Sequence, residues 1–129
     1  MILVDTTVWI DFFNNNKNNK VSLFEKLIEE NEDICINGVI ITEILQGIKN
    51  DSDFDNVKEI INDLIYIDTK QENYIYAAQI YRNCRRKGYT IRKPIDCIIA
   101  SICINNGIFL LHNDKDFDHI CKLFPLQCL

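Results

Sequence analysis

The sequence has few residues that interrupt regular structure and no long apolar run. Its 129 residues include four glycines and two prolines and no flexible or proline-rich linker, so we expect one domain over residues 1–129. No apolar stretch approaches the roughly 20 residues that a helix needs to cross a bilayer. No basic segment followed by a long apolar run opens the chain, as it would in a signal peptide. These absences favour a cytoplasmic protein without a membrane partner.

Positive charge is also scarce. The 14 Lys and Arg face 19 Asp and Glu, a net charge of −5, which argues against gripping nucleic acid through a broad basic surface. A nuclease is still compatible with this negative charge, because metal ions can supply positive charge at the scissile phosphate. One basic segment, Arg82–Lys93, either steers RNA or complements the end of a helix. The two histidines, His112 and His119, lie on different expected elements, which favours structural or solvated roles over acid–base catalysis.

The six cysteines do not form a recognisable metal or disulfide pattern. None has C-x-x-C spacing, and most lie inside apolar runs. Free buried cysteine behaves as a small apolar residue. We therefore expect core positions for Cys35, Cys84, Cys97, Cys103, Cys121 and Cys128.

Short apolar runs alternate with segments of helical periodicity. The runs predict strands at 2–5, 33–37, 64–68 and 108–113, with a fifth edge strand from the tail at 125–129. Helices are expected at 6–13, 21–31, 39–48, 52–64, 70–88, 93–107 and 114–123, with Ser52 and Asp53 as cap residues of the fourth and a polar loop at 14–20. Apolar strands separated by helices indicate a parallel sheet covered on both faces. The fold class is therefore α/β, a doubly wound three-layer sandwich with a mainly parallel sheet of four to five strands.

Acidic residues follow the expected strands at the edge where such folds bind ligands. Asp5 ends the first strand, and Asp114 and Asp116 come just after the fourth. Asp96 lies in a first helical turn, and Glu43 lies one turn inside the helix after the second strand. Like charges brought together repel unless a cation relieves them. Carboxylates without Cys or His favour Mg²⁺ or Mn²⁺ over zinc.

Each carboxylate also has an ordinary structural explanation. Asp5 suits a helix N-cap, and Asp96 complements a helix dipole. Asp114 and Asp116 suit a turn or a cap. Glu43 is harder to explain in this way, because it occupies the apolar stripe of its helix. The set as a whole is therefore more informative than any member.

Three segments in this order resemble the PIN-domain ribonucleases, in particular the VapC-type toxins of toxin–antitoxin pairs. They are VDTTVWIDFF, TEILQGI and KPIDCIIASICINNGIFLLHNDKDFDHI, and with their helical spacers they cover essentially the whole chain. The resemblance implies a PIN-like sandwich and a Mg²⁺-dependent endoribonuclease that hydrolyses RNA with a metal-activated water, with Mn²⁺ as a substitute ion. It further implies a homodimer that a cognate antitoxin protein holds inactive.

The resemblance also carries roles onto individual residues. The catalytic or metal-binding positions are Asp5, Thr6, Glu43, Asp96, Asp114 and Asp116. The first three acidic metal ligands are Asp5, Glu43 and Asp96, and Asp114 is preferred to Asp116 as the fourth. Thr6 matches a Thr or Ser that hydrogen-bonds the first carboxylate or a metal-bound water. His112 stands where relatives often have Thr or Ser.

The first helices are rich in large apolar side chains, namely Val8, Trp9, Phe12, Phe13 and Phe24. They exceed what a small core obviously needs, so they point to a homodimer. For Trp9 and Phe13, four residues apart, packing is favoured over stacking on RNA bases.

Two other functions compete with the nuclease. A phosphatase with a covalent aspartyl intermediate needs a second Asp two residues after Asp5, where Thr7 stands. A non-catalytic PIN-like protein-interaction module is the stronger alternative. The loss of one or more of the acidic site residues would favour this module, but all of the acidic positions are filled in this sequence.

Overall fold

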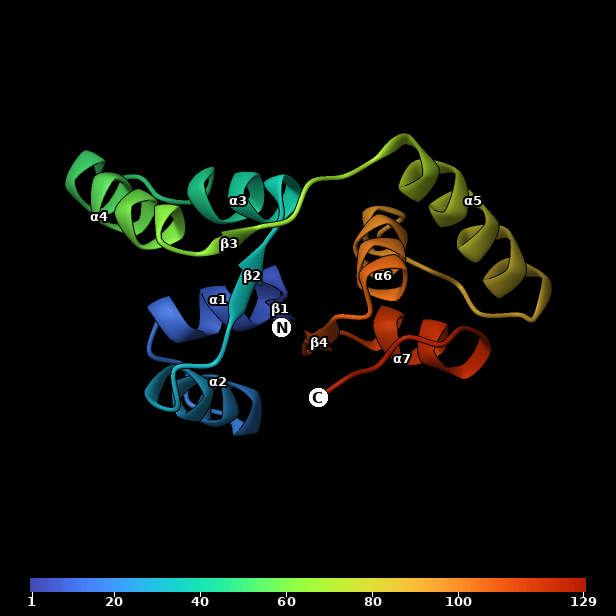
Figure 1. Cartoon of the computed structure of the whole chain (residues 1–129), viewed down its shortest axis with the longest axis horizontal. Coiled ribbons are helices and arrows are strands. Elements are labelled where there is room, and N and C mark those ends of the chain that lie inside the picture. The colour runs from blue at the N-terminus through green and yellow to red at the C-terminus, as the bar shows by residue number, and fades with distance from the viewer.

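A four-stranded parallel sheet runs through the centre of the computed structural model, which describes residues 1–129 (Figure 1). The strands are β1 (Ile2–Val4), β2 (Ile34–Ile36), β3 (Ile65–Tyr66) and β4 (Phe109–Leu111), in the order β3-β2-β1-β4. All three strand pairs are parallel. The predicted parallel sheet is confirmed.

Seven helices cover this sheet. They are α1 (Thr6–Phe13), α2 (Asn19–Glu29), α3 (Gly38–Leu45), α4 (Asp51–Asn62), α5 (Gln71–Arg86), α6 (Ile95–Asn106) and α7 (Lys115–Leu123). Figure 1 shows α1 to α4 on one side and α5 to α7 on the other, and the contacts between helices follow the same division. The three-layer α/β/α sandwich predicted from the sequence is therefore confirmed.

The central strands are apolar because both of their faces are covered. In β1, Leu3 and Val4 are completely buried, whereas the edge strand β3 leaves Tyr66 54% exposed. The fifth strand predicted from the tail is wrong as a strand. A single parallel bridge joins Cys128 to Leu110, so the tail lies beside β4 without extending the sheet.

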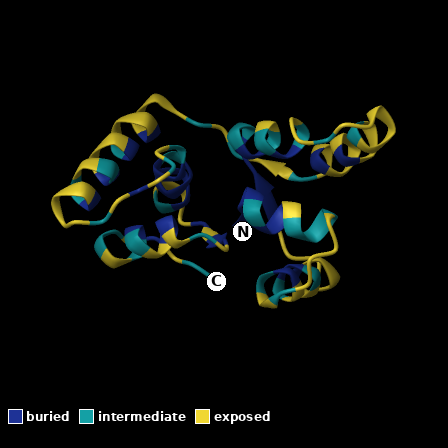
Figure 2. Cartoon of the chain, turned by 180° about the vertical axis from the view of Figure 1, so that it is seen from behind, coloured by how far each residue is buried: buried dark blue, intermediate teal, exposed yellow.

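Helix α6 is the central helix of its layer. It contacts α5, α7 and β4, so it is buried on most sides and its sequence is apolar all round. Gly107, with φ +62°, ends it in the left-handed region that glycine adopts freely. Helix α5 is amphipathic instead, and Figure 2 shows its buried residues on the face turned towards α6. Neither α6 nor any other helix is long and apolar enough to span a membrane.

The aromatic residues of α1 and α2 pack against one another inside the domain. Trp9 and Phe24 are buried, with ring centroids 4.7 Å apart in an edge-to-face arrangement. Phe12 lies 5.1 Å from Phe24, and Phe13 stacks on Trp9 at 5.6 Å. Val8 is also completely buried. These residues fill the core, so they no longer argue for a dimer, which stays a prediction.

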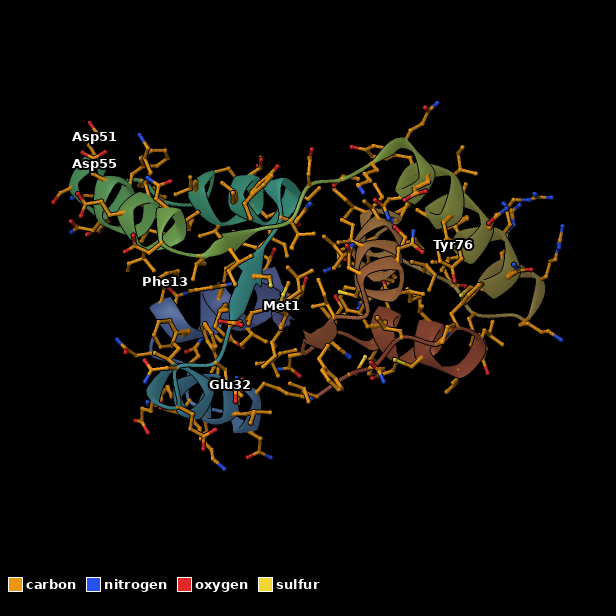
Figure 3. The ribbon with its side chains drawn as sticks, in the orientation of Figure 1. Met1, Phe13, Glu32, Asp51, Asp55 and Tyr76 are labelled. Carbon is orange, nitrogen blue, oxygen red and sulfur yellow. The ribbon has the colours of Figure 1, made fainter.

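The start of α4 differs from the prediction. Asn50, rather than Ser52 or Asp53, is the N-cap, and its Oδ1 accepts hydrogen bonds from the backbone N–H groups of both. Asp51 and Asp55 project outward from the first turns of this helix (Figure 3). These two carboxylates belong to the solvent-exposed surface.

The six cysteines are all free thiols, and four of them are buried as expected. Cys121 and Cys128 are only partly buried, and their Sγ atoms lie 2.9 Å apart. This contact attaches the tail to α7. Both still pack against the hydrophobic core, so the expectation of core positions holds for them only in part.

Candidate functional site

The register of the sheet aligns the ends of β1 and β4. Val4 pairs with Leu111, and the backbone N–H of Asp5 donates to the carbonyl of Leu111 at 2.9 Å. The residues that directly follow β1 and β4 in the chain therefore lie at the same edge of the sheet. Asp5 lies at the carboxyl end of β1, as the sequence predicts, and is 3% exposed.

Asp5 is also the N-cap of α1. Its Oδ2 accepts from the backbone N–H of Thr7 at 3.3 Å and from the Thr7 hydroxyl at 2.8 Å. The capping explanation is therefore correct, and it is compatible with a ligand role because both capping bonds end on Oδ2 and leave Oδ1 available for a ligand. Sequence reasoning treated the two as alternatives, although one carboxylate can do both.

Three further carboxylates meet at this edge. One oxygen each from Asp96, Asp114 and Asp116 lies within 4.8 Å of the others. Asp96 is in the first turn of α6, Asp114 is the N-cap of α7, and Asp116 is in the first turn of α7. Asp114 Oδ1 accepts from the backbone N–H of Asp116 at 2.9 Å. The α7 N-terminus therefore places both candidates for the fourth acidic position in one cluster.

The group of three carboxylates does not include Asp5 or Glu43, and the contact of Glu43 at this edge is with Thr6, the neighbour of Asp5. Glu43, on α3, accepts from the Thr6 hydroxyl at 2.8 Å in a partly buried contact. The hydroxyl that binds Asp5 is that of Thr7, so Thr6 does not make the bond to the first carboxylate that was one of its two expected roles. Thr7 Oγ1 also accepts from the backbone N–H of Asn113 at 3.3 Å, which joins α1 to the loop before α7. These bonds attach three segments of the site to one another.

Asp96 lacks the partners that a buried carboxylate requires. It is 3% exposed, and its Oδ2 is buried without any hydrogen bond. Its nearest cation, the ammonium of Lys93, lies 3.7 Å away, too far for a hydrogen bond. Burial, together with the charges of Asp5, Asp114 and Asp116, raises the pKa of Asp96 to about 8, against the opposing effect of Lys93.

Asp114 has the opposite electrostatic environment. Burial alone would raise its pKa, but the hydrogen bond from Lys93 and that from the Asp116 backbone outweigh burial and lower it. Lys93 Nζ lies 2.6 Å from Asp114 Oδ2, and the Lys93 backbone N–H donates to Asp116 Oδ2 at 3.0 Å. Arg92 lies near both, with Nη2 3.5 Å from Asp114 and Nε 3.7 Å from Asp116.

Sequence reasoning missed these roles of Arg92 and Lys93. Both were grouped with the basic segment that ends at Lys93, and the available signal was the spacing of Lys93 three residues before Asp96. Arg85 and Arg86, by contrast, belong to the last turn of α5, where basic residues complement the helix dipole. The basic segment therefore divides into two parts with different environments.

His112 is structural. It is 4% exposed, its Nδ1 accepts from the backbone N–H of Asp114 at 3.1 Å, and burial lowers its pKa. A neutral ring is required for this acceptor role, since both nitrogens of a charged imidazole are donors. His112 therefore helps to hold the loop that carries Asp114. His119 is remote from this role and stacks on Tyr89 with centroids 4.9 Å apart.

The donor set fits a hard divalent cation. It consists of carboxylate oxygens, the ligands that Mg²⁺ and Mn²⁺ prefer, and no cysteine or histidine belongs to the cluster. The unpartnered Oδ2 of Asp96 is an additional indication, because a buried oxygen without a donor is costly until a cation binds it. The arrangement can therefore support hydrolysis of a phosphate ester.

Comparisons with known proteins agree with this fold. The PIN domain family model matches residues 2–123. The chain is 34% identical over 129 residues to the VapC ribonuclease Mb1587 of Mycobacterium bovis and to ribonuclease VapC11 of Mycobacterium tuberculosis, covering 98% of this chain and 96% of each relative. Among solved structures, VapBC2 from Rickettsia felis, bound to a DNA fragment from its promoter, is similar with a TM-score of 0.77 and 21% identity, covering 100% of this chain and 98% of that one.

Proposed function

The chain belongs to the PIN domain family, and within it to the VapC ribonucleases, and from this premise we propose that it is the ribonuclease toxin of a toxin–antitoxin pair. The single observation that carries the proposal is the cluster of Asp96, Asp114 and Asp116 at the carboxyl edge of the sheet. The proposed reaction is hydrolysis of internal phosphodiester bonds of RNA.

We assign the metal ligands of this reaction to Asp5, Glu43, Asp96 and Asp114, with Asp116 as the alternative to Asp114. The proposed ion is Mg²⁺, with Mn²⁺ as a substitute, since all the donors are carboxylate oxygens. When bound, the ion supplies the positive charge that activates water and stabilises the phosphoryl oxygens.

The other side chains of the site orient the carboxylates and adjust the charge. Thr7 fixes Asp5 and Thr6 fixes Glu43, each through a hydrogen bond of 2.8 Å. Arg92, whose side chain is 68% exposed, places positive charge at the rim of an otherwise acidic site. A phosphodiester approaching a chain with a net charge of −5 needs such local attraction.

Removing divalent metal is expected to abolish cleavage. Total cellular RNA incubated with the protein should be cut in Mg²⁺ or Mn²⁺ and remain intact in EDTA, because the clustered carboxylates cannot stabilise a phosphate without a cation. Gel electrophoresis of the RNA measures this directly. Cleavage that persists in EDTA would contradict the metal assignment. Intact RNA under all conditions would favour the non-catalytic interaction module.

We propose that the antitoxin binds a groove with apolar and polar lining residues that includes Glu43. The groove has a volume of about 740 Å³ and lies between α1, α3 and α4, with Glu43, Ile10, Phe13, Ile44 and Ile48 among its lining residues. A peptide bound there would bury apolar surface and reach Glu43. The groove therefore gives a partner both an anchor and access to the site.

Ile10→Arg tests this groove. Ile10 is 40% exposed, so the change should leave the fold intact. A charge in the middle of an apolar contact is expected to weaken antitoxin binding by about tenfold or more. Surface plasmon resonance with the co-expressed antitoxin measures the affinity, and RNA cleavage by the free variant is the control. Unchanged affinity would place the antitoxin on another surface.

We also propose a homodimer. The support for it comes from apolar side chains that are exposed in the single chain. They include Ile65 and Tyr66 on β3 and Tyr74 and Ile75 on α5. Light scattering at micromolar concentration should give twice the 15.1 kDa of one chain. The mass of a single chain would exclude a stable dimer.

A further inference from the structure

The ammonium of Lys93 occupies the acidic cluster. Its Nζ lies 2.6 Å from Asp114 Oδ2 and 3.7 Å from Asp96 Oδ2. The Lys93 side chain is 43% exposed, whereas those of the two aspartates are 6% and 5% exposed. The cation therefore enters from solvent and ends against buried oxygens.

The backbone of Lys93 is fixed, and only its side chain is free to move. Its N–H donates to Asp116 Oδ2 at 3.0 Å, and its carbonyl accepts from the backbone N–H of Asp96 at 2.9 Å. Pro94 follows and restricts the chain further. The lysine stem carries several rotatable bonds, so the ammonium can leave the cluster without any change in the backbone.

Arg92 does not fill the same position. Its contacts with Asp114 and Asp116 are longer, at 3.5 and 3.7 Å, and its side chain is 68% exposed. No contact joins it to Asp96, whose Oδ2 has Lys93 as its only cation. Lys93 is therefore the side chain that lies between the two acids.

We infer that Lys93 is a tethered positioning residue that neutralises the acidic cluster in the metal-free protein and that a divalent ion must displace. The inference rests on the proposed function for the identity of the ion. An ammonium and a divalent cation cannot share the same oxygens, because their charges repel at such short distances. Lys93 therefore lowers the metal affinity of the site while it keeps the empty cluster from repelling itself.

Metal titration tests this inference. Isothermal titration of Mn²⁺ into Lys93→Gln should show affinity at least about tenfold tighter than in the parent, because the competing charge is gone. Lys87→Gln is the matched control, since Lys87 is an exposed residue at the end of α5 and the charge change is identical. Its affinity should stay within about twofold of the parent. Unchanged or weaker binding by Lys93→Gln would show that Lys93 assists the metal, and would overturn the inference.

Thermal unfolding gives an independent readout. In EDTA, Lys93→Gln should melt below the parent, because Asp114 loses the ammonium that lies 2.6 Å from its Oδ2. In saturating Mn²⁺ the order should reverse, because tighter binding stabilises the variant more. An equal deficit under both conditions would mean that Lys93 stays in place when metal binds, which also overturns the inference. Failure of the proposed function would instead appear as intact RNA with the parent protein in Mg²⁺.

Discussion

Asp96→Asn should lower the rate of RNA cleavage by at least about two orders of magnitude, since changes merely adjacent to metal ligands cost about 10–100-fold. Asn has the shape of Asp and fits the first turn of α6, but it lacks the negative charge that a divalent cation needs. Asp5→Asn should have a similar effect. Asn is as good an N-cap as Asp, so α1 should still form while the charge is lost.

Asp55→Asn is the matched control for both variants. It makes the same chemical change on the exposed surface of α4, where Asp55 projects outward (Figure 3). Helix α4 lies on the other side of the sheet from α6 and α7, which carry the acidic cluster (Figure 1). Its cleavage rate should equal that of the parent, and circular dichroism should show the same fold in all the proteins. Full activity in Asp5→Asn would mean that Asp5 only caps α1. Full activity in Asp96→Asn would remove the cluster from the reaction.

The edge on which the site lies could be predicted because it depends on topology. Apolar runs alternating with helices define a parallel sheet, and parallel strands end at one edge. The location of Asp5 and Asp114 at this edge could be predicted because they come directly after β1 and β4. The location of Asp96 could be predicted as well, because α6 begins at the same edge. None of these inferences needed the conformation of a side chain.

The partners of these carboxylates could not be predicted, because they depend on tertiary contacts between distant segments. The bond from Thr6 to Glu43 joins residues 37 positions apart, and that from Lys93 to Asp116 joins residues 23 apart. The aromatic packing of Trp9 and Phe24 likewise depends on how α1 meets α2. A count of apolar residues could not decide between core and interface for such side chains.

The stability of Asp96→Asn relative to the parent should rise with pH in metal-free protein. The pKa of Asp96 is raised from 3.8 to about 8 in the folded state, so the folded protein holds a proton that the unfolded chain releases between these values. The stability that this proton provides is fully present below pH 3.8 and is lost as the pH rises through about 8. The asparagine side chain of the variant does not titrate, so the variant escapes this loss.

Urea denaturation in EDTA at pH 5 and pH 9 measures the difference. Because one pKa unit corresponds to about 1.36 kcal/mol, the variant should gain on the order of a few kcal/mol on the parent between the two pH values. Asp55→Asn, whose carboxylate is exposed, should show no such gain. A pH-independent difference for Asp96→Asn would mean that Asp96 is already ionised in the folded protein. The repulsion within the cluster would then be relieved without metal, and Lys93 is the only cation placed between Asp96 and Asp114 to relieve it.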